Sequence, residues 1–555
     1  MNEKEVQELY KNDAELQLID DEPVSYDEAA IKEDWVKAMK AELDSIVRNN
    51  TWTLTQLPPG NKAIGLKWVF KLKKDAKGNV TKHKARLIAK GYVQQKGVDF
   101  EDAFAPVARL ETIRLLLAIA AKGNWLVHHL DVKSAFLNGE LKEEVYVTQP
   151  VGFEVKGKER MVYHLQKALY GLRQVPRAWN ARLDKSLKEL GFSRCTHEQA
   201  VYKVHNPSFI LIVGVYVDDL IVTGSSEERI HEFKKKMKSV FDMSDMGKLS
   251  YYLGIEVEQT RMGISMKQEA YAEKILKMAG MSKCNATTFP MTPKLQLTKD
   301  EDGEDADPTL YRKIIGSLRY LIHTRPDLSY SVGAVSRFMQ SPKQSHFAAV
   351  KQILRYVRGT VGYGLKYNGG GDDKLFGYSD SSYGTDVEDR RGTTGMAFYY
   401  SNNLITWSSQ KQKTVALSSC EAEFMASTSA ACQALWLRNL ISDLMGEEAQ
   451  VVKLFLDNEA AIALTKNPVF HGRSKHIDTK HHFIPECVER GQVCVEHVSG
   501  NLQKADILTK PLPRVKFAEM RSLVGMDDLH KDVNTTGESV GPVLTEFTGG
   551  KRCKE

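Results

Sequence analysis

The stretch that most constrains the fold is residues 209–225, FILIVGVYVDDLIVTGS, in which two apolar runs flank the adjacent acids Asp218 and Asp219. Runs this rich in β-branched and aromatic residues predict two strands, and the acids fall where a hairpin must turn. Two neighbouring carboxylates between buried strands repel each other unless a cation lies beside them. Hard oxygen ligands suit Mg²⁺ or Mn²⁺. The pattern therefore indicates either a metal-binding hairpin or a solvated turn in which the acids serve only the turn.

The length and composition of the chain narrow the class of protein. A chain of 555 residues is too long for one hydrophobic core, so we expect two to four domains. Its contents of 42% hydrophobic and 27% charged residues are ordinary for globular proteins. The longest apolar runs, such as residues 115–121 and 209–217, are far too short to span a bilayer. Residues 1–28 are acidic and lack the apolar centre of a secretion signal.

The seven cysteines indicate a reducing compartment. Their number is odd, they are scattered, and no two have the CxxC spacing, so we expect free thiols. The expected location is the cytoplasm, with access to the nucleus left open. Histidines and cysteines gather between His476 and His497, but no pair has the spacing of a zinc finger, which disfavours a zinc site.

Positive charge is concentrated near the beginning of the chain. The formal net charge is only +6, yet residues 62–96 hold 11 lysines and arginines against one acid. Residues 67–73 and 85–91 have strand patterns around a turn at 77–79, which predicts a basic hairpin. Such a hairpin suits a polyanion held near a metal site, although a solvated basic face is the simpler alternative. The candidates for gripping a triphosphate or a template are Lys84, Arg86 and Lys90.

A third carboxylate changes the interpretation of the paired acids. Residues 125–131 have the pattern of a strand that ends in Asp131 and turns into a polar loop. One carboxylate from a separate strand and the paired acids of a hairpin can hold two divalent ions about 3.5–4 Å apart. Such ions activate a 3′-hydroxyl and stabilise the leaving pyrophosphate in phosphoryl transfer. We therefore predict that Asp131, Asp218 and Asp219 converge as metal ligands and catalytic residues.

Three motifs in chain order carry a family resemblance. They are LDVKSAFLNG at residues 130–139, LYGLRQVPRAW at 169–179 and YVDD at 216–219. Together with KWVFK at 67–71 and KARLIAKG at 84–91, they resemble the reverse transcriptase of copia-type LTR retrotransposons. The resemblance covers residues 35–513 and implies an α/β (α+β) chain with a right-hand polymerase fold of fingers, palm and thumb. It also implies that Asp131 and Asp218 bridge the metals, with Asp219 more peripheral.

The same resemblance assigns roles to four residues near the predicted palm. Phe136, five residues after the first acid, takes the place of an aromatic ring that collides with a 2′-hydroxyl and so rejects ribonucleotides. Taken alone, this residue reads as a packed core aromatic. Tyr170, Gly171 and Gln174 resemble the loop beneath the incoming nucleotide and the template base.

The later part of the chain contains a second set of four acids. Asp380 and Asp457 each end a predicted strand, Glu423 lies in a predicted helix, and Asp506 comes last in the chain. The segment SSCE at residues 418–421 has the spacing of a capping box. This gives Glu421 a structural role and leaves Glu423 free to face the site, although the reverse assignment stays open. Four converging carboxylates repel one another strongly without ions, so two divalent metals are expected here as well.

Strand-end Asp, helix Glu, strand-end Asp and late Asp, in this order, resemble ribonuclease H. The resemblance implies hydrolysis of the RNA strand of an RNA–DNA hybrid, which is recognised by its A-like shape and its 2′-hydroxyls. His497, close to the last acid, is a candidate for assisting product release, as a histidine does in related nucleases. We expect Mg²⁺ or Mn²⁺ in both sites, two ions in each.

The predicted domain organisation follows from these motifs and the patterns between them. Trp35, Met39 and Ile46 recur at helical spacing, so the first helix is expected at residues 34–48. Residues 311–330 look helical, and so do 342–359; both resemble the segment that connects polymerase to nuclease. The expected boundaries are a disordered acidic leader at 1–33, the reverse transcriptase at 34–298, an acidic linker at 299–308, a helical connection at 309–371, a ribonuclease H-like domain at 372–513 and a partly disordered tail at 514–555.

The sequence thus predicts an RNA-directed DNA polymerase with ribonuclease H activity, which copies retrotransposon RNA into DNA and degrades the template. Its expected partners are an RNA template, a DNA primer strand, the RNA–DNA hybrid and dNTPs, with a tRNA as the usual primer of the family and no membrane. The oligomeric state is left open. One alternative is an inert or domesticated remnant that only binds nucleic acid, against which the presence of all the expected acids counts. Another is an RNA-directed RNA polymerase, against which Phe136 counts.

Overall fold

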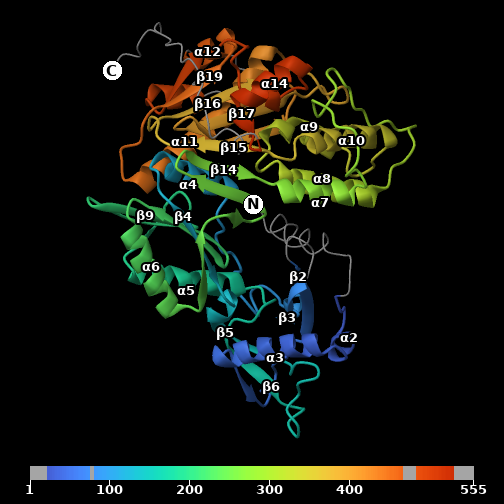
Figure 1. The fold of residues 1–555 in the computed structure, drawn as a ribbon, viewed down its shortest axis with the longest axis vertical. Helices are drawn as coiled ribbons and strands as arrows, with labels where there is room; N and C mark the ends of the chain where they lie inside the picture. The colour runs from blue at the N-terminus through green and yellow to red at the C-terminus, as the bar shows by residue number, and fades with distance from the viewer. Residues whose placement is uncertain (1–21, 75–79, 467–482, 531–555) are drawn as a thin grey trace.

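The computed structural model describes residues 22–74, 80–466 and 483–530 and has two parts stacked along its long axis (Figure 1). The lower part is coloured blue to green, and the upper part runs mostly from green-yellow to red. Among the helices of these residues, none is long and apolar enough to cross a membrane.

Residues 22–33 are folded, although their composition predicts disorder. The prediction of a disordered leader over 1–33 is wrong for residues 22–33, where the short helix α2 (Tyr26–Ala30) forms. Glu22 accepts the backbone N–H of Leu72 at 2.7 Å, and this contact anchors the acidic segment to the fold. A contact between residues 50 positions apart cannot be inferred from amino-acid composition. The residues before this segment lie outside the described part of the chain.

Helix α3 (Glu33–Arg48) confirms the first predicted helix. Its apolar face buries Trp35, Met39 and Ile46 and packs against strand β3 (Val80–Ala89). Strand β3 pairs with β2 (Leu66–Lys74) as the predicted basic hairpin, whose turn lies outside the described residues. A three-stranded sheet completes this region in the order β1 (Trp52–Thr55), β6 (Val162–Lys167) and β5 (Glu140–Val147).

The central sheet of the lower part carries the paired acids. Its strands, in spatial order, are β11 (Met243–Lys248), β4 (Val127–Val132), β10 (Asp219–Gly224), β9 (Phe209–Tyr216), β8 (Val201–Asn206) and β7 (Ser193–Arg194). One face is covered by α5 (Val175–Glu189) and α6 (Glu227–Val240), the other by α4 (Leu110–Lys122). Leu220 and Val222 point toward α5 and α6, whereas Ile221 points toward α4, as the period of two in a strand requires.

The connection between the two parts is helical, but it contains a break and a strand. Its helices are α8 (Pro308–Leu321), α9 (Ser329–Ser336) and α10 (Gln344–Gly359). The continuous helix predicted at 311–330 is wrong: α8 ends at Leu321, and Pro326, which lacks a backbone N–H, opens a short 3-10 turn. The connection predicted as helical over 309–371 also ends in a strand, β15 (Tyr363–Asn368).

Strand β15 belongs to a sheet that draws on three of the predicted domains. Its strands, in order, are β12 (Tyr251–Tyr252), β13 (Ile255–Thr260), β14 (Gly263–Lys267), β15 and β21 (Met526–Asp528). The tail expected at 514–555 is therefore folded at its start, where α14 (Arg514–Leu523) buries Phe517 and Met520 ahead of β21. Helix α7 (Glu269–Met278) follows β14.

The upper part is built on a five-stranded mixed sheet. Its strands, in spatial order, are β18 (Asn403–Lys411), β17 (Thr393–Tyr400), β16 (Leu375–Ser381), β19 (Val452–Leu456) and β20 (Val493–His497). Strands β16, β19 and β20 run parallel, so their carboxyl ends share one edge. Helix α11 (Ser419–Met445) packs across the sheet, and α12 (Glu459–Lys466) follows β19. The predicted strand-end acids are thereby brought to one edge.

One of the buried hydrophobic clusters spans both parts. The largest buried cluster runs from α4 in the lower part through α8 and α10 to Phe398 and Trp407 of the upper sheet. Arg114 of α4 donates hydrogen bonds to the carbonyls of Ile405, at 2.7 Å, and His323, at 2.8 Å. Its guanidinium also lies 4.0 Å from the ring centroid of Trp407. The lower and upper parts are therefore packed against each other.

Candidate active sites

The first candidate site lies at the tip of the β9–β10 hairpin. Strand β10 pairs with β4 in a register that sets Asp219 opposite Asp131. The backbone N–H of Val132 donates to the carbonyl of Asp218 at 2.9 Å, so the tip is tied to the neighbouring strand. The three acids predicted to converge are therefore neighbours across two strands.

The hairpin tip has an unusual backbone that a second contact holds in place. Val217 has φ of 59°, a left-handed conformation that costs energy for a β-branched residue. The indole N–H of Trp179, from α5, donates to the carbonyl of Val217 at 2.7 Å. The motif that contains Trp179 thus fixes the turn that presents the acids.

The electrostatics at this tip show that the acids influence one another. Burial raises the pKa of Asp218 to about 6, and the negative charges of Asp219 and Asp131 add to the rise. Burial and the charge of Asp219 likewise raise the pKa of Asp131. Such mutual repulsion favours a cation at this position. Within the described residues, however, these three carboxylates do not gather as tightly as those of the second site, where three converge within 4.8 Å.

His129 is a functional candidate that the sequence reasoning missed. Its Nε2 lies 2.8 Å from Oδ1 of Asp219, and its ring packs edge-on against Tyr252 at 5.6 Å. The signal was present: His129 precedes Asp131 by two residues on one strand, and that spacing places both side chains on the same face. His129 therefore positions the third acid of the site.

The two basic candidates of the β2–β3 hairpin have different surroundings. Burial lowers the pKa of Lys84, while the negative charges of Asp218 and Asp131 oppose that shift, so Lys84 lies near enough to the acids to interact with them. Arg86 instead forms an ion pair with the buried Glu42 of α3 at 2.8 Å. Its guanidinium lies 5.0 Å above the ring of Tyr170. Arg86 thus has a structural contact, and its role in substrate binding stays a prediction.

Phe136 and the predicted nucleotide loop lie together. The ring centroids of Phe136 and Tyr170 are 5.3 Å apart. The carbonyl of Tyr170 accepts the N–H of Ala89, the last residue of β3, at 2.7 Å. Gly171 has φ of +95°, and a Cβ there would lie 2.2 Å from the carbonyl oxygen of Ala89. Only glycine therefore allows this loop to approach the hairpin so closely.

Gln174 is buried and only partly satisfied. Its Oε1 accepts a hydrogen bond from the side chain of Gln94 at 3.2 Å. Gln94 in turn accepts the backbone N–H of Arg173 at 2.9 Å. The Nε2 of Gln174 has no hydrogen-bond partner among the described residues. A buried amide donor of this kind is costly to leave unpaired, and it belongs to the predicted nucleotide loop.

The second candidate site lies at the shared edge of the parallel strands. Asp380 is on β16, Asp457 follows β19, and Glu423 reaches them from α11. One carboxylate oxygen of each lies within 4.8 Å of the others. Glu423 Oε1 accepts the backbone N–H of Ser381 at 3.0 Å, while its Oε2 has no hydrogen-bond partner in the described part of the chain. Three of the four predicted nuclease acids thus form one cluster.

This cluster gathers three carboxyl groups, two of which, Asp380 and Glu423, are buried. Burial raises the pKa of Glu423 to about 10, and the charges of Asp380 and Asp457 add to the rise. Burial and Asp380 also raise the pKa of Asp457. A group of this kind takes up protons or cations at neutral pH because its carboxylates cannot all ionise together.

Asp506 lies beside the tight triad rather than within it. It begins the short 3-10 helix Asp506–Leu508, and burial together with Asp380 raises its pKa to about 6. Lys510 Nζ lies 2.7 Å from Asp506 and 3.7 Å from Asp380. The hydroxyl of Thr509 donates to Asp380. The sequence reasoning missed Lys510, although its spacing of four from Asp506 could have revealed it.

The structure also separates Glu421 from Glu423. Ser418 caps α11 by accepting the N–H of Glu421 at 3.1 Å, as predicted. The Glu421 carboxylate accepts the backbone N–H of Leu417, one residue before the position expected for a capping box. Glu423 is the glutamate that joins the cluster. His497 ends β20 opposite Leu456, the residue that precedes Asp457.

The chain shares a long aligned region with proteins of known family. The family described as reverse transcriptase (RNA-dependent DNA polymerase) matches residues 49–293. Over 506 residues the chain is 40% identical to a retrovirus-related Pol polyprotein from transposon TNT 1-94 of Nicotiana tabacum, covering 89% of this chain and 38% of that protein. It is 32% identical over 302 residues to the transposon Ty5-1 protein of Saccharomyces cerevisiae, covering 54% of this chain and 98% of that protein.

One solved structure has a similar fold over nearly the whole chain. It is the foamy viral protease-reverse transcriptase in complex with RNA/DNA hybrid, with a TM-score of 0.51 and 12% identity. The match covers 93% of this chain and 57% of that chain. At this identity the likeness concerns the fold alone. The predicted fold class, a right-hand polymerase followed by a ribonuclease H-like α/β domain, is confirmed.

Proposed function

Because this chain belongs to the copia-type Pol proteins of retrotransposons, we propose that it is an RNA-directed DNA polymerase that also hydrolyses the RNA of RNA–DNA hybrids. One observation carries the proposal: Asp131 lies opposite Asp219 beside the hairpin tip, and a second carboxylate cluster lies on a different sheet. Two separate acidic sites suit two separate phosphoryl-transfer reactions. The chain spans 38% of the length of the tobacco polyprotein. The activities assigned here to the chain are therefore a proposal.

The residues of both sites fit divalent cations. Carboxylate oxygens are the ligands that Mg²⁺ and Mn²⁺ prefer, and the Oε2 of Glu423 has no protein partner among the described residues. When bound, two such ions in each site would activate the attacking oxygen and neutralise charge on the reacting phosphate. Asp131, Asp218 and Asp219 would hold them in the polymerase. The nuclease ligands would be Asp380, Glu423, Asp457 and Asp506.

Other side chains of the polymerase site bind and select the nucleotide. Lys84, whose charge interacts with those of Asp218 and Asp131, offsets the negative charge of a triphosphate. Phe136 occupies the space that a 2′-hydroxyl needs, so the clash lowers the rate with ribonucleotides. Gly171 lets the nucleotide loop lie against β3, and Gln174 of the same loop offers the nucleotide an amide donor that has no partner among the described residues. His129 holds Asp219 in one orientation.

Side chains around the nuclease cluster adjust its charge and release the product. Lys510 pairs with Asp506 and keeps it beside Asp380 before any ion binds. His497 lies next to Asp457 and assists departure of the cleaved strand. The solved foamy viral protein is in complex with RNA/DNA hybrid. The partners proposed for this chain are of the same class: an RNA template, a DNA primer strand and dNTPs, with a tRNA as the first primer. The proposed location is the cytoplasm.

Primer extension tests this function. The chain should extend a DNA primer on an RNA template in Mg²⁺, use dNTPs far better than rNTPs, and shorten the template as synthesis proceeds. A chelator should stop both reactions, since both need the ions. Binding of the template without extension or cleavage would contradict the proposal and identify an inert nucleic-acid-binding remnant instead. Equal use of rNTPs would contradict the role given to Phe136.

A further inference from the structure

We propose that Arg337, at the end of α9 in the connection, is a positioning residue of the nuclease. It holds the loop between β16 and β17 and, through that loop, the strand that carries Asp380. The inference rests on the proposed nuclease function and deepens it. It makes cleavage of the hybrid dependent on a residue that lies outside the nuclease sheet.

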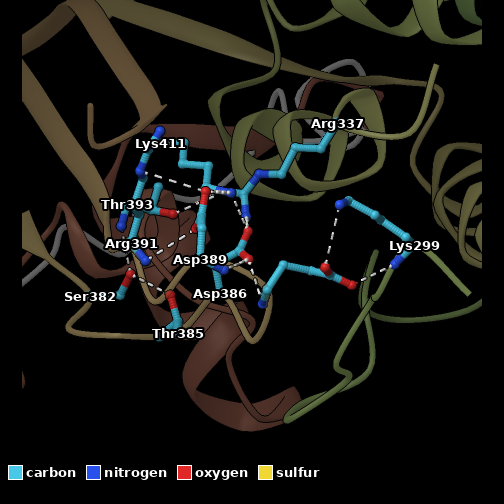
Figure 2. Close-up of polar contacts among 10 residues, drawn as sticks. Lys299, Arg337, Ser382, Thr385, Asp386, Asp389, Arg391, Thr393 and Lys411 are labelled. Atoms are coloured by element: carbon cyan, nitrogen blue, oxygen red, sulfur yellow. Dashed lines mark hydrogen bonds and ion pairs between the residues drawn. The ribbon is translucent and has the colours of Figure 1, made fainter. Parts of the chain in front are cut away.

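The loop in question, residues 382–392, begins just beyond Asp380 and leads directly into β17. Figure 2 shows its polar side chains grouped around Asp386. One carboxylate oxygen of Asp386 accepts the backbone N–H groups of Glu388, at 3.0 Å, and Asp389, at 3.3 Å. The Asp386 side chain is only 9% exposed. Asp386 is therefore the residue around which the loop folds.

Arg337 grips this loop at two points. Its guanidinium donates to Oδ2 of Asp386 at 3.0 Å and to the hydroxyl of Thr393, the first residue of β17, at 3.1 Å (Figure 2). The two contacts join the middle of the loop to its end. A planar guanidinium suits this task because it offers several donors in a fixed geometry, which a lysine cannot match.

Two further cations support the same loop. Lys411 of β18 pairs with Asp386 at 2.6 Å and with Asp389 at 2.8 Å. Lys299, from the acidic linker, donates its backbone N–H to Glu388 at 2.9 Å (Figure 2). The linker and the connection thus both reach the loop, whereas Lys411 comes from the nuclease itself. The loop is therefore held both by the nuclease sheet and by the segments that precede the nuclease in the chain.

The loop is tied closely to the catalytic acids. Ser382 and Thr393 close its base, with the N–H of Ser382 donating to the carbonyl of Thr393 at 3.0 Å. The neighbouring N–H of Ser381 donates to Glu423. Any shift of the loop base therefore moves Ser381, its hydrogen bond to Glu423 and the adjacent Asp380. A misplacement of about 1 Å in such a site can cost a hundredfold in rate.

The test compares three variants of the full chain. Arg337→Met removes both contacts, and Arg337→Lys keeps one charge for Asp386 but cannot reach both partners. Arg312→Met is the matched control, because Arg312 lies in the same connection and, within the described residues, donates to the carbonyls of Met339 and Gln340 rather than to the loop. Each variant is measured in three ways: cleavage of a preformed RNA–DNA hybrid, primer extension, and hydrogen exchange of the loop amides.

Arg337→Met should lower kcat for hybrid cleavage about tenfold or more while KM for the hybrid changes little. Hydrogen exchange should accelerate in residues 382–393 but not across the rest of the nuclease, and primer extension should stay at the wild-type level. For Arg337→Lys, kcat and the rate of loop exchange should lie between the wild-type values and those of Arg337→Met. Arg312→Met should match the wild type in all three measurements.

Three results would overturn the proposal. One is a wild-type kcat and wild-type loop exchange in Arg337→Met. Another is an equal effect of Arg312→Met, which would indicate a general need for the connection. The third is faster exchange throughout the nuclease, which would show that the domain as a whole is destabilised. If the wild-type chain cleaves no hybrid, the proposed function fails, and wild-type loop exchange in Arg337→Met then still overturns the positioning role.

Discussion

At the scale of single residues, each site depends on partners that come from other parts of the fold. His129 fixes Asp219, and Lys510 stands between Asp506 and Asp380. These partners offset part of the repulsion among the acids, which burial makes severe. The acids themselves occupy predictable positions, since strand ends and hairpin tips can be inferred from apolar runs. Their partners obey only weak spacing rules and are easily overlooked.

Phe136 offers a prediction at this scale. Phe136→Val should increase the use of rNTPs relative to dNTPs by about a hundredfold, because removal of the ring opens space for a 2′-hydroxyl. Incorporation of dNTPs should persist, since Phe136 is not one of the acids expected to hold the metal ions and its ring packs on Tyr170. The measurement is single-nucleotide insertion with each substrate. Unchanged selectivity in an active variant would show that another residue selects the sugar.

The two basic candidates illustrate the limit of residue-level prediction. Lys84 and Arg86 are two positions apart and lie on the same side of one strand, so the pattern cannot separate their roles. The distinction comes from Glu42 of α3, which binds Arg86 and leaves Lys84 near the acids. A contact between residues so far apart in sequence cannot be predicted from either segment alone.

At the scale of elements, the strongly periodic segments were predictable and the interrupted ones were not. Helix α3 and the β9–β10 hairpin match their predictions because the burial of one face dictates their pattern. The helix predicted at 311–330 failed because apolar residues continue past a proline that ends the backbone ladder. Strand β15 was missed since its partners, β14 and β21, are distant in the chain.

The close approach of the nucleotide loop to β3 gives a prediction at the scale of elements. Gly171→Ala should lower kcat/KM for dNTP insertion about tenfold, because a Cβ would strike the carbonyl oxygen of Ala89 and force the loop away. Hybrid cleavage should be unaffected, since it takes place on a different sheet. Gly157→Ala is the control: Gly157 also has positive φ, but a Cβ there meets nothing within 4 Å. Equal losses in both variants would indicate backbone strain rather than the contact.

At the scale of the whole molecule, the predicted domain boundaries do not coincide with the boundaries of packing. One sheet contains strands from the polymerase, the connection and the C-terminal segment. One buried cluster extends from helix α4 of the lower part to the five-stranded sheet of the upper part. Sequence motifs mark where chemistry changes along the chain, but they carry no information on which surfaces pack together. One buried cluster therefore joins the two parts that carry the two carboxylate sites.

Asp443 of α11, in the upper part, forms several polar contacts with the lower part. Its carboxylate accepts the thiol of Cys195, at 3.0 Å, and the backbone N–H of Thr196, at 2.7 Å, and it forms an ion pair with Lys203. Burial acts to raise the pKa of Asp443, but these contacts outweigh it and hold the pKa well below its ordinary value. The ionised carboxylate is therefore favoured in the folded state.

This depressed pKa sets the sign of a pH-dependent prediction. Above the unfolded pKa of about 4, Asp443 contributes its full stabilisation, which is lost as the pH falls toward the lower folded pKa. Asp443→Asn should therefore lower the free energy of unfolding by about 2 kcal/mol at neutral pH and by less in acid. Chemical denaturation at both pH values measures the difference. Asp302→Asn, at an exposed position in the linker, should have little effect at either pH. A deficit that grew in acid would contradict the assignment.

The most direct test of two independent active sites is one assay that follows a labelled primer and a labelled RNA template together. Asp218→Asn should abolish primer extension and leave cleavage of a preformed hybrid intact, because Asp218 belongs to the hairpin tip. Asp457→Asn should abolish cleavage and leave extension intact, because Asp457 belongs to the cluster on the upper sheet. If either substitution removed both activities from folded protein, the assignment of two separate sites would be wrong.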